Sequence, residues 1–279
     1  MVQKMKTECV ISVEKVSKDY RFRKRTRNKL IDFLKPEYEK IRAVSDVTFK
    51  IYSGESVGLI GKNGAGKSTL IKMMAGILYP SNGTIRVNGL EPYKNRTENA
   101  KYIGVVFGQR SQLWWDIPIL ESFRLFQKMY RIPRKDFEER LSLFQKMFGM
   151  ENYMTKPVRQ LSLGQRMCAD LCASMLHNPP VLFMDEPTIG LDVLNKENMR
   201  NFVKEVNLQF GTTIILTSHD LDDIEELCQR MILIDNGKML FDGSLEGFER
   251  KASAGRNADP ADKNLEEAVK IYYRRETSE

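Results

Sequence analysis

The chain has 279 residues, 42% of them hydrophobic and 29% charged, a composition typical of a folded protein with one large or two medium domains and not of a disordered chain. No apolar run approaches the roughly 18 residues of a membrane-spanning helix, and residues 1–10 lack the apolar stretch of a secretory signal, so we expect a chain that reaches a membrane only through partners. The net charge of +7 suggests an acidic ligand, nucleic acid or an anionic membrane surface.

The chain has four cysteines, and two of them, Cys168 and Cys172, lie four residues apart on one face of a predicted helix. A metal site would need more ligands nearby, and the chain has only two histidines. We therefore expect the cysteines to be buried, reduced thiols of a cytosolic protein.

Strands alternate with helices along most of the chain, which favours a mostly parallel sheet. Residues 10–13 and 47–51 alternate apolar and polar side chains, as half-buried strands do. A short apolar strand over 56–60 ends in a glycine-rich turn, a helix is predicted over 67–78, and a further strand is predicted over 102–107.

The stretch from 113 to 160 has a purely helical pattern. Apolar side chains recur at helical spacing after Pro118 and again after Pro133, and proline suits the first turn of a helix. We expect a helical subdomain inserted between strands of the sheet.

The alternation of strands and helices returns after residue 180. Strands are predicted over 181–184, 212–217, 231–234 and 238–241, and helices over 195–209 and 221–228. A polar linker over 253–262 leads to a short amphipathic tail helix marked by Leu265, Ala268, Val269 and Tyr272.

Residues 61–68, Gly-Lys-Asn-Gly-Ala-Gly-Lys-Ser, fit the phosphate-loop pattern in full and lie between a predicted strand and a predicted helix. Glycines let consecutive backbone N–H groups turn toward a phosphate, and the start of the helix adds the positive end of its dipole. Lys67 can neutralise the β- and γ-phosphate oxygens, and the Ser68 hydroxyl can bind Mg²⁺.

The apolar strand at 181–184 ends in two carboxylates, Asp185 and Glu186. Downstream of a phosphate loop, Asp185 is placed to hold Mg²⁺ through water, and Glu186 to polarise the water that attacks the γ-phosphate. These features alone fit GTPases, kinases, helicases and transport ATPases.

Further motifs narrow the class. Residues 161–165, Leu-Ser-Leu-Gly-Gln, resemble the signature motif of ATP-binding-cassette (ABC) ATPases, with Leu163 at a position where glycine is common. Gln109, Asp192, His219 and Tyr20 stand where that family has its Q-loop, its D-loop, its switch histidine and the aromatic ring that stacks on adenine. The resemblance covers about residues 8–245.

The likeness extends to one subgroup of that family. Residues 106–116 (VFGQRSQLWWD) and 161–167 (LSLGQRM) are similar to those of the ATPase subunits of viologen- and daunorubicin-type drug exporters, in which leucine at position 163 is ordinary. The resemblance therefore implies an exporter ATPase and leaves the substrate open.

The fold that the resemblance implies is α/β, a P-loop NTPase of ABC type. Its RecA-like core would carry N-terminal antiparallel β-strands and an inserted α-helical subdomain. The implied segments are residues 1–112 as the first part of the nucleotide-binding core with a basic insert at 21–45, 113–178 as the helical subdomain with the signature, 179–250 as the second part of the core, and 251–279 as a linker and C-terminal helix.

The resemblance also implies a head-to-tail dimer, either of two identical chains or with a related ATPase. Each ATP, with Mg²⁺, would lie between the phosphate loop of one subunit and the signature of the other. The dimer would sit on the cytoplasmic face of the cell membrane beside separate membrane-spanning permease subunits. The implied catalytic residues are Glu186, His219 and Lys67. The implied ATP-binding residues are Tyr20, Gly61, Asn63, Gly64, Ala65, Gly66, Lys67, Ser68, Thr69, Gln109, Ser162, Gly164, Gln165 and Asp192, and the implied Mg²⁺ ligands are Ser68, Gln109 and Asp185.

Related functions fit the sequence less well. Chromosome-maintenance ATPases carry a long coiled-coil insert and translation factors carry two cassettes, whereas this chain has a short insert and one cassette. Importer ATPases often add a regulatory domain and polysaccharide exporters a sugar-binding domain, but only about 35 residues follow Gly243. The guanine motif Asn-Lys-x-Asp of GTPases is absent from the sequence. We expect no nucleic-acid partner.

Both tryptophans, Trp114 and Trp115, adjoin Gln109. Two neighbouring indoles on an extended segment do not readily share one buried face, so we expect one of them to be exposed, and tryptophan is enriched at binding hot spots. Our hypothesis is that one tryptophan lines a groove for a cytoplasmic helix of the membrane subunit; the alternative is that both pack inside the helical subdomain.

The positive charge is concentrated in one segment, because residues 21–42 hold nine Lys or Arg and three acidic residues. The apolar residues Leu30, Ile31, Phe33 and Leu34 suggest a short amphipathic helix within it. This basic insert could contact anionic lipid headgroups or an acidic loop of the membrane subunit; a solvated surface loop is the alternative.

Overall fold

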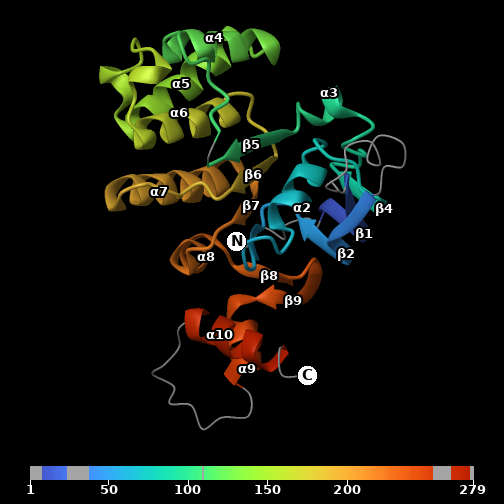
Figure 1. Cartoon of the computed structure of the whole chain (residues 1–279). Coiled ribbons are helices and arrows are strands. Elements are labelled where there is room, and N and C mark those ends of the chain that lie inside the picture. The colour runs from blue at the N-terminus through green and yellow to red at the C-terminus, as the bar shows by residue number, and fades with distance from the viewer. Residues whose placement is uncertain (1–7, 24–37, 109, 254–264, 277–279) are drawn as a thin grey trace, which may run out of the picture.

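The computed structural model describes residues 8–23, 38–108, 110–253 and 265–276, with only the backbone described for 253 and 274–276 (Figure 1). Four sequence predictions lie wholly or partly outside these residues: Gln109, residues 24–37 of the basic insert, the short amphipathic helix at 30–34 within that insert, and all but the first residue of the linker at 253–262.

The larger sheet has six strands in the order β5-β6-β7-β3-β8-β9. Its strands are parallel except for β9, which pairs antiparallel with β8. Strands β3 and β7 are buried along their whole length, and a parallel sheet covered on both faces explains such continuous apolar runs. The strands are β3 (Ser56–Ile60), β5 (Ile103–Phe107), β6 (Val181–Asp185), β7 (Thr213–Thr217), β8 (Arg230–Asp235) and β9 (Lys238–Ser244).

This strand order positions the candidate site. Strands β6, β7 and β3 are neighbours and run in the same direction, so the residues that follow them meet at one edge of the sheet. The phosphate loop follows β3, the two carboxylates stand at the end of β6, and His219 follows β7.

A second sheet has three antiparallel strands in the order β2-β1-β4, namely β1 (Cys9–Arg23), β2 (Tyr38–Tyr52) and β4 (Asn82–Val87). The predicted strands at 10–13 and 47–51 are confirmed, but both strands are much longer than predicted. Residues 21–23 pair with 38–40, so both ends of the predicted basic insert are strand. We did not predict β4, although its residues alternate between buried and exposed at Ile85, Arg86 and Val87.

The large sheet separates two apolar cores. On one face, Val57 and Leu59 pack with α2 (Lys67–Met74) and with the inner side of the three-stranded sheet. On the other face, Leu182 and Leu216 pack with α6 (Leu163–Met175), α7 (Val193–Phe210), α8 (Leu221–Leu227), α9 (Leu245–Ser253) and α10 (Leu265–Glu276). Helix α2 ends four residues earlier than predicted, because Ala75 and Gly76 begin a turn.

The helical stretch lies beyond the β5 edge of the large sheet in Figure 1. It contains α4 (Ile119–Met129), α5 (Arg134–Phe148) and α6 (Leu163–Met175), with short 3₁₀ turns at Met150–Asn152 and Val158–Gln160. Pro118 and Pro133 stand at the N-caps of α4 and α5, which confirms the predicted starts. The prediction of helix from residue 113 is wrong for 113–118, which are not helical.

The described chain also contains α3 (Arg96–Asn99), α7 (Val193–Phe210), α8 (Leu221–Leu227) and α9 (Leu245–Ser253). The predicted tail helix is α10 (Leu265–Glu276), which packs against α9. We predicted neither α3 nor α9. None of the described helices is both long and apolar enough to cross a membrane.

The cysteine prediction holds for three of four residues. Cys168, Cys172 and Cys228 are buried free thiols, and burial raises the pKa of Cys168 and of Cys228 to about 12. Cys9 is exposed at the start of β1, so the prediction of burial is wrong there.

Candidate functional site

The phosphate loop joins β3 to α2 and takes its shape from glycine. Gly64 and Gly66 have φ of +82° and +110°, a region that side chains disfavour. A Cβ on Gly66 would lie 2.5 Å from the Ala43 carbonyl oxygen of β2, so the second sheet leaves no room for another residue. Helix α2 begins at Lys67, so its free N–H groups open onto the loop and favour an anion.

Lys67 folds back over its own loop. Its Nζ donates hydrogen bonds to the carbonyl oxygens of Gly61 at 2.6 Å and Lys62 at 3.1 Å. Burial lowers the pKa of Lys67, and the charges of Glu186 and Asp185 oppose that shift. A cavity of about 180 Å³ lies over the loop, lined by residues 63–69 and Glu186.

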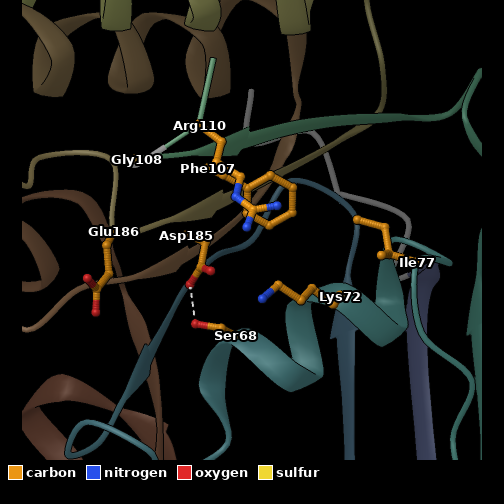
Figure 2. Close-up of a pocket in the computed structure, with 8 residues that line it drawn as sticks. All are labelled: Ser68, Lys72, Ile77, Phe107, Gly108, Arg110, Asp185 and Glu186. Atoms are coloured by element: carbon orange, nitrogen blue, oxygen red, sulfur yellow. Dashed lines mark hydrogen bonds between the residues drawn. The ribbon is translucent and has the colours of Figure 1, made fainter. Parts of the chain in front are cut away.

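Asp185 is the point at which three elements meet. Its Oδ1 accepts hydrogen bonds from Ser68 Oγ of α2 at 2.9 Å and from Thr217 Oγ1 of β7 at 2.7 Å. Figure 2 shows the hydrogen bond that joins Ser68 to Asp185. Both residues line a cavity of about 340 Å³ that Lys72 and Arg110 also line. A carboxylate beside a hydroxyl, next to a phosphate-binding loop, is an oxygen donor set that suits Mg²⁺.

Glu186 stands in a constrained backbone position. Its φ is +53°, unusual for a residue with a side chain. Its N–H donates to Thr217 O and Thr217 Oγ1, both at 3.0 Å. Gly108 packs so closely that a Cβ there would collide with the Glu186 carbonyl oxygen. The Glu186 carboxylate is thereby held at the edge of the phosphate-loop cavity.

His219 lies beside this carboxylate, with 3.7 Å between His219 Nδ1 and Glu186 Oε1. The imidazole is 55% exposed, so it faces the open side of the site. The structure therefore brings together five predicted site residues from the start of helix α2 and the ends of strands β6 and β7: Lys67, Ser68, Asp185, Glu186 and His219.

The signature residues form a second group. Ser162 caps α6 with a capping box, in which Gln165 N donates to Ser162 Oγ at 3.2 Å and Ser162 N donates to Gln165 Oε1 at 3.1 Å. A Cβ on Gly164 would collide with the Asn195 side chain. Asn195 in turn donates to both carboxylate oxygens of Asp192, at 2.9 and 2.7 Å.

Leu163, at a position where glycine is common in the family signature, packs against a neighbouring turn. A Cβ added to Gly190 would lie 3.0 Å from Leu163 Cδ2, so the leucine lies against the turn that leads to Asp192. The signature and the Gly190–Asp192 turn are therefore one unit. Among the described residues that line the cavity over the phosphate loop, none comes from this unit.

Tyr20 is the predicted base-stacking residue and lies near the loop. Its hydroxyl is 3.4 Å from Thr69 Oγ1 at the start of α2. The Phe22 ring follows on the same side of β1, with 6.2 Å between the ring centroids.

Sequence reasoning missed three neighbours of the site: Thr217, Gly108 and Tyr273. Thr217 bonds both to Asp185 and to the Glu186 backbone, and its position at the end of the predicted strand next to His219 was the available signal. Lys62 Nζ of the phosphate loop lies 4.3 Å from the Tyr273 ring centroid of α10. The sequence does not predict this contact, because Tyr273 lies in the tail helix, far along the chain from Lys62.

Comparison with known proteins places the chain in a family. Residues 44–189 match the family model described as ABC transporter. The ABC transporter ATP-binding protein NatA of Bacillus subtilis is 34% identical over 218 residues, covering 78% of this chain and 88% of that protein. The linearmycin resistance ATP-binding protein LnrL of the same organism is 32% identical over 211 residues, covering 76% of this chain and 67% of that protein.

A solved structure gives the same picture. The ATP-binding cassette MJ0796, determined as a dimer in a post-hydrolysis state with ADP and Pi, superposes with a TM-score of 0.69 and 25% identity. The superposition covers 84% of this chain and 98% of that one.

Proposed function

Because the chain belongs to the ABC transporter family and is an ABC ATPase, we propose that it works as a head-to-tail dimer that drives export of a substrate through separate membrane-spanning subunits. The observation that carries the proposal is the division of the site: residues 63–69 and Glu186 line one cavity, and among the described residues of that lining none comes from the signature unit. A second copy would supply the missing half.

The residues of the phosphate-loop half have distinct proposed roles. Lys67 and the N-terminus of α2 would neutralise the phosphates, and Tyr20 would stack on adenine. Ser68 and Asp185 would hold Mg²⁺, which supplies charge neutralisation for the phosphates. Glu186 would orient the attacking water, and His219, beside it, would contact the γ-phosphate.

The signature half would act on the ATP of the opposite subunit. Ser162 and Gly164 stand at the N-terminus of α6, where free N–H groups favour a phosphate. ATP would join the two subunits, and loss of the γ-phosphate would release them. Asp192, at the N-cap of α7, would lie along the same contact.

Export is supported by the likeness of residues 106–116 and 161–167 to drug-exporter subunits and by the name of the resistance protein LnrL. The test is sensitivity to viologens and anthracyclines in a native host that lacks the chain. We expect increased sensitivity, restored by the wild-type chain and not by Glu186→Gln. If the host that lacks the chain takes up one nutrient more slowly, and its sensitivity to these drugs is unchanged, the chain would instead belong to an importer.

We propose the two tryptophans as the contact with the membrane subunit. Trp114 and Trp115 are 41% and 51% exposed, so the alternative that both pack inside is wrong. Trp114 rests on Phe126 with 5.4 Å between ring centroids, and the Arg166 guanidinium lies 5.5 Å from the Trp115 ring centroid. The rings are thus held in place with one side open, as in a binding hot spot.

Replacing either tryptophan with alanine is expected to reduce the membrane protein that co-purifies with the chain by tenfold or more, because each loses about 2 kcal/mol of contact. The measurement is stoichiometry after affinity purification from detergent-solubilised native membranes. Tyr102→Ala is the matched control, since Tyr102 is 39% exposed and precedes β5 at the opposite end from Arg110. If both tryptophan variants co-purify with as much membrane protein as the wild-type chain does, the two tryptophans are not the contact with the membrane subunit.

We also propose that the basic insert contacts anionic lipid. In its described part, Arg21, Arg23 and Lys40 are exposed on paired strands next to exposed Phe22 and Ile41. Exchange of Arg23, Lys24, Arg25 and Arg27 for glutamine is expected to lower binding to phosphatidylglycerol vesicles by about three orders of magnitude, since each of the four cations contributes roughly 1 kcal/mol. Flotation with neutral vesicles is the control. Equal binding of wild type and variant would favour a solvated loop.

A further inference from the structure

A buried carboxylate outside the ATP-binding residues joins the two halves of the site. Asp170, in the middle of α6, is 5% exposed. Its side-chain Oδ1 accepts hydrogen bonds from Ser111 Oγ at 3.0 Å and from Gln112 N at 2.9 Å. The backbone carbonyl oxygen of Asp170 accepts a third hydrogen bond, from Gln112 Nε2 at 2.9 Å. Three bonds therefore connect one helical residue to the loop after β5. We call this group the latch: Asp170, Ser111 and Gln112.

One end of the latch leads to the catalytic carboxylates. Ser111 follows Arg110, which lines the cavity with Asp185 and Glu186 (Figure 2). In the same loop, Gly108 N donates to the Asp185 carbonyl oxygen at 2.9 Å, and Gly108 packs on the Glu186 backbone. The start of this loop is therefore in direct contact with the backbone of both carboxylate residues.

The other end leads to the signature. Ser162, Arg166 and Asp170 are spaced four residues apart, so they lie along one side of the start of α6. Arg166 contacts the Trp115 ring, so two successive turns of the helix hold the same loop. The loop is therefore bonded to the same helix that begins with Ser162 and Gly164.

Burying the Asp170 carboxylate costs free energy, because the carboxylate loses its contact with water. Burial raises the pKa of Asp170 to about 6, while the bonds from Gln112 and Ser111 and the charge of Arg166 oppose the shift. An apolar residue would fill the same space without the cost of removing a carboxylate from water. A buried polar group whose acceptors are used in this way fixes one arrangement of the elements that it joins.

We propose that Asp170 is a positioning residue that makes the loop after β5 and helix α6 move as one body, so that the state of Glu186 in one subunit sets the position of the signature that this subunit presents to its partner. This proposal rests on the proposed function, because it needs the signature to act on the opposite ATP. It assigns Asp170 no contact with ATP.

The test compares Asp170→Leu, Asp170→Asn and Ser111→Ala in steady-state ATP hydrolysis and in ATP binding to the single chain. We expect Asp170→Leu to lower kcat tenfold or more with ATP affinity within twofold of wild type. Asp170→Asn, which keeps an acceptor oxygen, should recover kcat to within about threefold. Ser174→Ala is the control and should leave kcat unchanged, since Ser174 is buried in the same helix and its hydroxyl donates to Leu171 O of that helix.

A double-mutant cycle separates positioning from general destabilisation. Ser111→Ala should lower kcat about threefold in the wild-type background and have no further effect with Asp170→Leu. If Asp170→Leu does not fold, Ser111→Ala and Gln112→Leu carry the test, each lowering kcat without changing ATP affinity. Wild-type kcat in these variants, additive effects in the cycle, or an equal loss of ATP affinity would overturn the proposal. Absence of ATP hydrolysis by the wild-type chain would instead contradict the proposed function.

Discussion

The variant Glu186→Gln is expected to hydrolyse ATP at least 100 times more slowly than the wild-type chain while binding ATP with similar affinity. The exchange removes the charge that would polarise water, and general-base catalysis is worth about 10²–10⁴ in rate. The change leaves the local structure intact, because the bonds that hold this position run from the Glu186 backbone to Thr217. Asp185 and Ser68 keep their contact.

Phosphate release and binding of a fluorescent ATP analogue measure the two quantities separately. Glu246→Gln is the matched control, because it makes the same chemical change at a side chain that is 82% exposed on α9. The control should hydrolyse ATP at the wild-type rate. Full turnover by Glu186→Gln would show that another group activates the water.

The variant Lys67→Met is expected to weaken ATP binding at least 100-fold and to abolish hydrolysis. In the wild-type chain the Lys67 ammonium group is a charged donor inside the loop, where burial makes each charge-assisted hydrogen bond stronger than in water. In the structure Lys67 Nζ bonds to the Gly61 and Lys62 carbonyl oxygens, and the phosphates of ATP would compete for the same ammonium group. Methionine fills a similar volume, so we expect the thermal midpoint to change little.

Isothermal titration with ATP measures the affinity directly. Lys146→Met, which removes an exposed lysine of α5, is the control for the general loss of a positive charge. It should bind ATP as the wild type does. An unchanged affinity in Lys67→Met would contradict the proposed phosphate contact.

Much of the phosphate-loop half could be predicted from the sequence, because its chemistry is local. Residues 61–68 are contiguous, and a strand that ends in Asp185 and Glu186 needs only a neighbouring parallel strand to face them. Once β6, β7 and β3 lie side by side, the ends of all three strands converge. That strand order, however, depends on contacts between residues more than 100 positions apart, which periodicity does not encode.

Burial of polar residues escaped prediction for a related reason. In the sequence, Asp170 in a helix indicates a solvent-facing position, yet the structure buries it against Ser111 and Gln112. The partner loop is 58 residues away, and no local pattern connects the two. The lengths of β1 and β2 were missed similarly, since polar side chains such as Arg21 and Lys40 pair in register on exposed strands.

The most direct test of the central claim is the mass of Glu186→Gln in solution, measured by light scattering with and without ATP. The account predicts a single chain of 32.3 kDa without nucleotide and about twice that mass with saturating ATP and Mg²⁺. Adding Lys67→Met to the same chain should prevent the doubling. A single-chain mass at saturating ATP would contradict a site completed by a second subunit.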